Sequence, residues 1–100
     1  MATEQQVQKQ IITYLESIGA YTVVTIKCSK SGVSDVLACL NGHFLSIEVK
    51  LPGQLSTVTL IQQYNLDLVI QSGGIAFAAT SVADVTNQLQ QHQLLPPMEV

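Results

Sequence analysis

The dipeptide Asn41-Gly42 separates two apolar runs, residues 33–40 and 43–50. Asn-Gly between apolar runs is the strongest short-range sequence signal for a two-residue β-hairpin turn, because both residues tolerate positive φ. Such a turn also fixes the register, since the residues that flank it pair first and the pairing then proceeds outward one residue at a time. The sequence therefore predicts two antiparallel strands and also which residues face each other across them.

This register places two carboxylates opposite each other. Asp35 pairs with Glu48, and side chains in such pairs are roughly 4.5–5.5 Å apart at Cβ, a distance at which like charges repel. Alternation along the strand puts Lys50 on the same face as Glu48. The opposite face is entirely apolar and is predicted to enter the core; it consists of Val36, Ala38, Leu40, Leu45, Ile47 and Val49.

Two interpretations account for the facing acids. In the first, Lys50 forms a salt bridge that neutralises them, but one lysine cannot neutralise two carboxylates, and the neighbouring residues are too apolar for a solvated surface. In the second, a divalent cation binds between the acids, because Mg²⁺ and Mn²⁺ prefer clusters of oxygen ligands. Such a cation can activate a water for attack on a phosphate, and Lys50 could orient or deprotonate that water.

A third acid, Glu4, fits the same picture. It precedes Val7 and Ile11 by three and seven residues, so it falls on the face of a predicted helix that packs inward. The alternative is a favourable charge at the helix N-terminus, worth about 0.3–1 kcal/mol. The sequence leaves both interpretations of Glu4 open.

The rest of the chain predicts a single α/β domain over residues 1–92 with the element order α-β-β-β-α-β-α. Helices are expected at about 3–18, with a Thr3–Gln6 capping box, at about 58–72 and at 82–91, and further strands at 21–28 and 75–80. The second helix is expected to turn its apolar side inward, namely Leu60, Ile61, Tyr64, Leu68 and Val69. Residues 93–100 contain two prolines and are expected to form a C-terminal tail.

The composition limits the partners. The net charge is −3, and the chain has no arginine, whereas proteins that bind nucleic acids normally carry a basic surface rich in arginine. If this protein binds DNA, a divalent metal must supply part of the positive charge. Lys27 and Lys30 flank the loop before Asp35 and could contact a phosphate, or they could serve only solubility.

No apolar run approaches the roughly 20 residues needed to span a membrane, and the N-terminus lacks the apolar core of a signal peptide, so a cytoplasmic protein is expected. Cys28 and Cys39 are too few and too isolated for a zinc site or a disulfide framework. Both cysteines are therefore expected to be reduced, buried side chains.

The order of these residues resembles the VRR-NUC (virus-type replication-repair nuclease) family of the PD-(D/E)xK nuclease superfamily. The resemblance rests on Asp35 followed by "EVK" at 48–50. Further matches are a helical glutamate at Glu4, "GVSD" at 32–35 for the family's G-x-P-D, Gln62 on the next helix, and Gly73-Gly74 before the last strand. It extends from residue 4 to about residue 90, with serine in place of the usual proline at position 34.

The resemblance implies a fold and a set of site residues. The fold would be a restriction-endonuclease-like αβββαβ core, a central mixed sheet flanked by helices, with an added C-terminal helix. Asp35, Glu48 and the carbonyl of Val49 would bind Mg²⁺ or Mn²⁺, and Lys50 would position the attacking water. Gln62, or Gln63 if the helix register differs by one, would orient the lysine or a water, and Glu4 would complete the cluster.

The resemblance also implies a function. Stand-alone members of the family resemble Holliday-junction resolvases, which cut branched DNA as symmetric dimers, because two active sites facing one junction require that symmetry. The chain is therefore expected to be a metal-dependent endonuclease of bacterial or phage origin that acts on branched or structured DNA as a homodimer. The alternatives are a non-catalytic DNA-binding or protein-interaction module with a nuclease fold, and a hydrolase of another phosphate ester.

Overall fold

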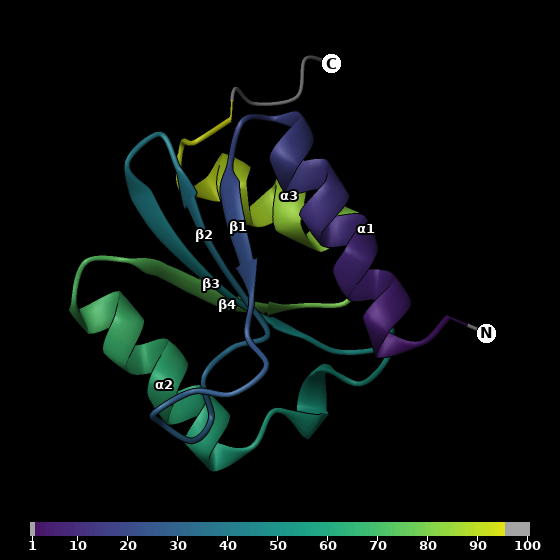
Figure 1. Cartoon of the computed structure of the whole chain (residues 1–100), viewed down its shortest axis with the longest axis vertical. Coiled ribbons are helices and arrows are strands. Elements are labelled where there is room, and N and C mark those ends of the chain that lie inside the picture. The colour runs from purple at the N-terminus through teal and green to yellow at the C-terminus, as the bar shows by residue number, and fades with distance from the viewer. Residues whose placement is uncertain (1, 96–100) are drawn as a thin grey trace.

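The computed structural model describes residues 2–95, so the predicted tail beyond Leu95 lies outside the described residues. The helices are α1 (Glu4–Ser17), α2 (Leu60–Gln71) and α3 (Val82–Gln91), with a short 3-10 turn η1 (Leu55–Thr57) before α2. The strands are β1 (Tyr21–Val24), β2 (Val36–Leu40), β3 (His43–Val49) and β4 (Ile75–Ala79). They form one sheet in the order β1-β2-β3-β4, in which only β4 runs parallel to its neighbour β3 (Figure 1). The expected α/β fold with a mixed sheet is confirmed.

The hairpin has the predicted turn and register. Asn41 and Gly42 both adopt positive φ, 51° and 82°. Leu40 pairs with His43, and the ladder of paired residues ends at Val36 and Ile47. Asp35 and Lys50, expected within strands, instead lie directly beyond the ends of β2 and β3.

Strand β1 is shorter than the sequence predicts, because it ends at Val24 instead of residue 28. One further contact follows the paired residues of β1 and β2. The Thr25 amide donates to the carbonyl of Asp35 at 2.9 Å, and the Thr25 hydroxyl donates to the carbonyl of Ser34 at 2.8 Å. The chain then leaves the sheet as a loop over 26–34. The β-branched pattern continues past the point where a partner strand is available, and for this reason the sequence predicts too long a strand.

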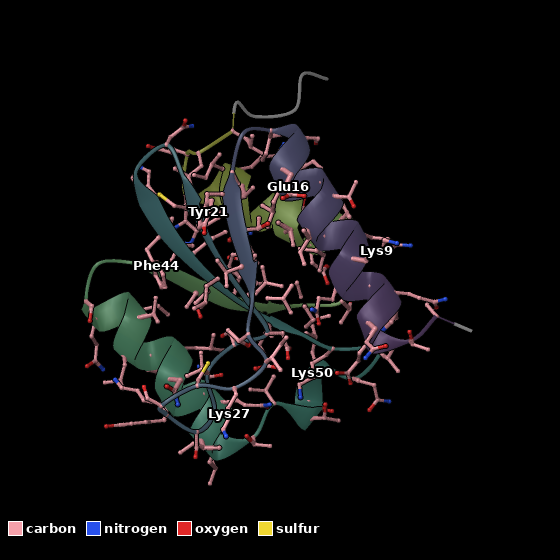
Figure 2. All side chains as sticks on the ribbon, in the orientation of Figure 1. Lys9, Glu16, Tyr21, Lys27, Phe44 and Lys50 are labelled. Atoms are coloured by element: carbon pink, nitrogen blue, oxygen red, sulfur yellow. The ribbon has the colours of Figure 1, made fainter. Side chains whose placement is uncertain are left out.

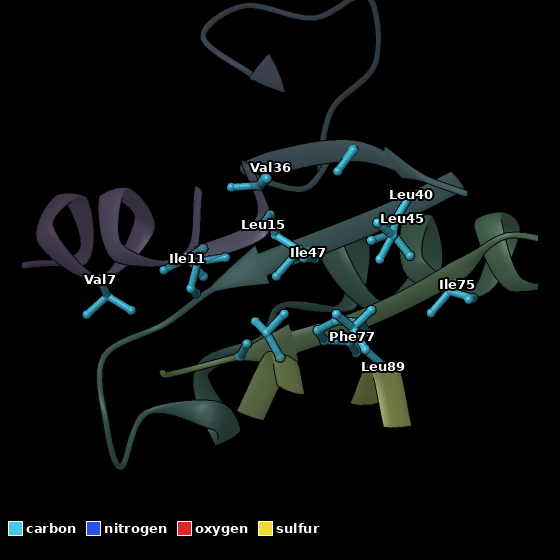
Figure 3. Packing of buried hydrophobic residues seen from close by; sticks show 14 residues of the cluster. Val7, Ile11, Leu15, Val36, Leu40, Leu45, Ile47, Ile75, Phe77 and Leu89 are labelled. Atoms are coloured by element: carbon cyan, nitrogen blue, oxygen red, sulfur yellow. The ribbon is translucent and has the colours of Figure 1, made fainter. Parts of the chain in front are cut away.

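The core lies between one face of the sheet and the helices α1 and α3 (Figures 1 and 3). All six hairpin residues predicted to face the core are buried. Ile11 and Leu15 of α1 and Val85 and Leu89 of α3 are fully buried against them. Burial of such a side chain contributes roughly 1.5–3 kcal/mol, so this layer holds the hairpin in place.

Helix α2 covers part of the other face, and its predicted orientation is wrong. Leu60 is 92% exposed, and Ile61 and Tyr64 are each at least half exposed. Leu66, in contrast, is 3% exposed. Leu68 and Val69 are half-buried, as expected of an inward side. Apolar residues occur on every side of this helix, so its periodicity does not select one face. The contacts of α2 with the sheet and with the 26–34 loop decide which face is buried.

The cysteines also differ from expectation, since Cys28 and Cys39 are both exposed. Cys39 lies on the α2 side of β2, and Cys28 lies in the 26–34 loop. Neither is a core side chain. No helix within residues 2–95 has both the length and the apolar character required to cross a bilayer.

The orientation of α2 can be tested by a matched pair of substitutions. Leu66→Ala should lower the free energy of unfolding by about 2–5 kcal/mol, because it leaves a cavity under the helix. Leu60→Ala should change it by less than about 0.5 kcal/mol, because the side chain is in solvent. Urea unfolding followed by circular dichroism measures both. Equal losses in the two variants would show that α2 is rotated relative to this structure.

Candidate active site

The structure brings Asp35 and Glu48 together at the end of the β2–β3 hairpin. Asp35 immediately precedes β2, and Glu48 is the penultimate residue of β3. The backbone N–H of Val49 lies beyond the last paired residues of the ladder, and the Asp35 carboxylate accepts its hydrogen at 2.9 Å through Oδ2. This bond fixes the orientation of the Asp35 carboxylate. The other carboxylate oxygen takes no part in it. The predicted juxtaposition of the two acids is therefore present.

Glu48 is buried, with 3% of its surface exposed. Burial, the largest cause, together with the hydrogen bond and the negative charge of Asp35, raises the pKa of its carboxyl from 4.5 to about 8. The positive charge of Lys50 lowers this pKa, but its effect is smaller than those of burial and Asp35. At neutral pH and without a bound cation, Glu48 therefore retains its proton and hydrogen-bonds to Asp35. A simple salt bridge to Lys50 does not describe this site.

Lys50 follows β3 directly and is itself buried, at 9% exposure. Its backbone N–H donates to the carbonyl of Ala79 at 3.0 Å, so the end of β4 holds its main chain in place. Figure 2 labels Lys50 in the region where the sheet ends, by η1. A buried ammonium group beside two acids has few water molecules to compete with a substrate anion.

Glu4 is the first residue of α1, and its side chain is exposed. Its charge nevertheless contributes to raising the pKa of Glu48, so it lies near the acid pair. Within residues 2–95, no three histidine, cysteine, aspartate or glutamate side chains are close enough together to hold a metal ion. Glu4 thus lies beside the pair without completing a three-carboxylate cluster.

Gln62 and Gln63 contact their own helix. Gln62 Oε1 accepts from the Thr59 backbone N–H at 2.9 Å, and Thr59 Oγ1 accepts from the Gln62 N–H at 3.2 Å, which together form a capping box. Gln63 Nε2 donates to Asp67 Oδ1 at 2.9 Å. The T-x-x-Q signal at 59–62 is visible in the sequence, and it places the start of α2 two residues later than the periodicity suggests. Among the described contacts, neither glutamine reaches Lys50 or the acid pair.

The loop that carries Lys27 and Lys30 is held against α2. Asn65 Nδ2 donates to the carbonyl of Ser31 at 2.8 Å. Gly32 has a φ of 78°, and a Cβ there would lie 2.7 Å from the carbonyl oxygen of Ile61, so only glycine fits. This contact positions the "GVSD" segment that ends in Asp35. Both lysines are exposed on this loop, and Lys27 is labelled in Figure 2.

Two buried hydroxyls beside the acids were not singled out from the sequence. Ser46 Oγ donates to Ser34 Oγ at 2.7 Å, and both residues are nearly inaccessible to solvent. Ser46 is on the same face of β3 as Glu48 because it lies two residues before it. Only the strand alternation could have indicated its position, and alternation gives no sign that a serine there has a partner.

The donor chemistry of this site fits a hard divalent cation. Asp35 and Glu48 are carboxylates, the ligands that Mg²⁺ and Mn²⁺ prefer, and they lie together at one end of the hairpin. A cation between them would take the place of the Glu48 proton and offset the repulsion that two ionised carboxylates would otherwise have.

No protein-family model and no curated protein sequence matches the chain. A solved structure described as "VRR_NUC domain" is similar, with a TM-score of 0.69 and 24% sequence identity. The match covers 91% of this chain and 98% of that one. The chain has the fold of a VRR-NUC domain. The likeness spans nearly the whole length of both chains, and it confirms the fold that the resemblance in sequence implied, an α/β core with a central mixed sheet.

The pKa of Glu48 predicts a dependence of stability on pH. The native state binds the Glu48 proton more tightly than the unfolded state, so its contribution is complete below about pH 4.5 and is lost as the pH rises through about 8. In metal-free buffer, the free energy of unfolding should fall over this window by up to about 5 kcal/mol. Chemical denaturation at a series of pH values measures it.

Glu48→Gln is the control for that measurement, because it keeps both histidines and removes only the titrating carboxyl. The variant should lose most of the pH dependence and be more stable than the parent above pH 8. Parallel curves for the two proteins would show that Glu48 ionises normally in the folded state.

Proposed function

We propose that this chain is a Mg²⁺- or Mn²⁺-dependent endonuclease that hydrolyses phosphodiester bonds in branched or structured DNA. The observation that supports it is the buried pair of Asp35 and Glu48 beside a buried Lys50, in a VRR-NUC fold. A buried acid pair costs free energy, and a glutamine at position 48 would relieve that cost. Retention of both acids is understandable if they bind a cation and difficult to understand if they only support the fold.

Asp35, Glu48 and the Val49 carbonyl would hold the cation. When bound, a divalent cation supplies Lewis-acid chemistry, since it acidifies water and stabilises negative charge on a phosphate. The hydrogen bond from the Val49 N–H already holds Asp35 in one orientation, so this ligand is positioned before a cation arrives. Glu48 has to lose its proton on binding, which makes cation affinity increase with pH up to about 8.

Lys50 would orient the attacking water and offset the charge of the phosphate. Its main chain is held by Ala79, so its position relative to Glu48 is fixed by the sheet. Glu4 would act through a water or a second ion, because its charge reaches Glu48 although its side chain is exposed. Gln62 could contribute only through the amide nitrogen, since Oε1 is used by the capping box. Lys27 and Lys30 would contact phosphates from the loop.

The second candidate is a non-catalytic module that binds DNA or another protein. The net charge of −3 and the absence of arginine favour it, because phosphate contacts normally come from basic side chains. Cation binding distinguishes the two, since a module without catalysis has no need of a metal at Asp35 and Glu48.

Cleavage is tested with labelled four-way junction, duplex and single-stranded DNA in Mg²⁺, Mn²⁺ or EDTA. Junction cleavage should require metal, and Asp35→Ala, Glu48→Gln and Lys50→Ala should each lower the rate at least about 100-fold, as losses of metal ligands or of acid–base groups do. Lys9→Ala, a surface substitution on α1, is the control and should cut like the parent. Cleavage by Glu48→Gln at the parental rate would refute the site assignment.

The same proteins report cation binding without catalysis. Mg²⁺ should raise the melting temperature by mass action, and more at pH 9 than at pH 6, because the cation competes with the Glu48 proton at low pH. Glu48→Gln should show little response. A parent protein that neither cuts DNA nor responds to metal would favour the binding module.

The proposed homodimer is supported by the exposed edge of the sheet. Strand β1 is an edge strand, and Tyr21, Val23 and Val24 are 72%, 42% and 41% exposed. Exposed edges in monomers usually carry charged residues or proline, and the segment "YTVVTI" at 21–26 contains neither. We propose that the β1 strands of two copies pair across a two-fold axis, which would bury these side chains and relate the two active sites by symmetry.

Val23→Lys should weaken this dimer, because the two-fold axis would bring two ammonium groups close together. Ile61→Lys, which adds the same charge on the exposed side of α2, should leave it intact. Light scattering during size-exclusion chromatography measures the mass of each protein over a range of concentrations. A parent protein that remains monomeric at high micromolar concentration would contradict the proposed pairing.

A further inference from the structure

A hollow of about 440 Å³ lies between the sheet and α2, on the face opposite the core. This volume is within the roughly 300–1,000 Å³ typical of small-ligand sites. Its floor is formed by β2 and β3 and one wall by α2, whose position over this face is seen in Figure 1. The residues that matter most for its chemistry are Leu37, Phe44, Ser46, Asn65, Leu68 and Val69.

The hollow adjoins the acid pair. Leu37 pairs with Ser46 across the hairpin, and Asp35 and Glu48 lie two residues further along the same face of their strands. Two residues along a strand span roughly 6.6 Å, about twice the rise of roughly 3.4 Å per nucleotide along one strand of duplex DNA and thus within reach of an adjacent nucleotide. A nucleotide neighbouring a phosphate held at the acids would therefore lie over the hollow.

Small side chains keep the hollow open. Gly74, the residue before β4, is part of the lining, and the residues of β4 that pair with Ser46 and Glu48 are alanines, Ala76 and Ala78. A Cβ on Gly74 would lie 2.7 Å from Val69 Cγ1 and 3.3 Å from Phe44 Cδ2, so a larger residue there would press on both walls. The space is therefore bounded by well-packed walls and is not a gap left by poor packing.

The lining combines apolar walls with a few polar atoms. Phe44 is 46% exposed and offers a ring at the surface, where Figure 2 labels it. Ser46 Oγ donates to Ser34 and can still accept a hydrogen bond, and Asn65 donates through Nδ2 to two carbonyls, which leaves Oδ1 as an acceptor. The one charged residue of the lining is Lys30, a cation in a protein of net charge −3.

We propose that this hollow receives an unpaired nucleobase of the DNA strand whose phosphate would be bound through a cation at Asp35 and Glu48. This inference rests on the proposed nuclease function. The base would stack against Phe44 and the aliphatic wall, its N–H groups would donate to Asn65 Oδ1 and Ser46 Oγ, and Lys30 would contact its phosphate. A base held in a duplex cannot enter without unpairing, so the hollow favours strands at branches, flaps and gaps.

The test uses oligonucleotides in which one base is the fluorescent analogue 2-aminopurine, either unpaired in a single strand or at a bulge, or paired in a duplex. The analogue is excited at longer wavelengths than those that tryptophan absorbs appreciably, so protein emission obscures the signal neither in the parent nor in variants that carry a tryptophan. Binding is measured in Ca²⁺, with gels to show that the DNA stays intact. The emission of the unpaired analogue should change on binding, and that of the paired analogue should not.

Two variants on the same helix provide a matched comparison. Leu68→Trp fills the hollow and should abolish the emission change and weaken binding of the single strand about tenfold, equivalent to about 1.4 kcal/mol and within the range for stacking of one base. Leu60→Trp adds the same ring on the exposed side of α2 and should behave like the parent. Phe44→Ala removes one wall at an exposed position, so it tests the same contact if Leu68→Trp misfolds.

The outcomes separate this inference from the proposed activity. An emission change without cleavage in Mg²⁺ would support the base site and contradict the nuclease. Cleavage with no emission change, or with equal binding by Leu68→Trp and Leu60→Trp, would support the nuclease and overturn the base site. A change with the free 2-aminopurine nucleotide but not with the oligonucleotides would also overturn it, because the hollow would then bind free nucleotides.

Discussion

The arrangement of this molecule depends on the register of the β2–β3 hairpin. The turn at Asn41-Gly42 sets it, and the register then decides which side chains enter the core and that Asp35 faces Glu48. A shift by one residue would turn the apolar set of one strand toward α2 and move the acid of that strand into the core. One register therefore produces both the core and the acid pair. The packing of the apolar face against α1 and α3 stabilises the register that creates the site.

The acid pair opposes folding, and the surrounding structure tolerates it. The protein reduces the cost by keeping Glu48 protonated, by giving Asp35 a backbone hydrogen bond from Val49 and by placing Lys50 nearby. A cation can replace the first of these, because it takes the place of the Glu48 proton, while the hydrogen bond from Val49 still orients Asp35. The site is thus held in a state that is stable without metal and whose two acids are already in position for one.

The features of this structure that are set by neighbouring residues could be predicted from the sequence, whereas those set by contacts between distant segments could not. The hairpin, the Thr3 cap and the helix at 82–91 follow from neighbouring residues, and the structure reproduces them. The orientation of α2 was wrong, because it depends on the sheet and the loop at Gly32 and not on the helix's own pattern. The pairing of the acids was predictable from the turn, whereas the pKa of Glu48 and the hollow beside Ser46 depend on burial by segments distant in sequence.

The scarcity of positive charge changes how such a site would select DNA. A protein with few lysines and no arginine gains little affinity from the release of counterions, which supplies most non-specific binding. Affinity would then have to come from the cation at the acids and from contacts to the nucleotide itself. The largely apolar hollow adjoining the acids offers such contacts only to unpaired bases. In this scheme low charge is compatible with nuclease activity, because weak attachment to duplex DNA increases the share of binding that depends on structure at the cut site.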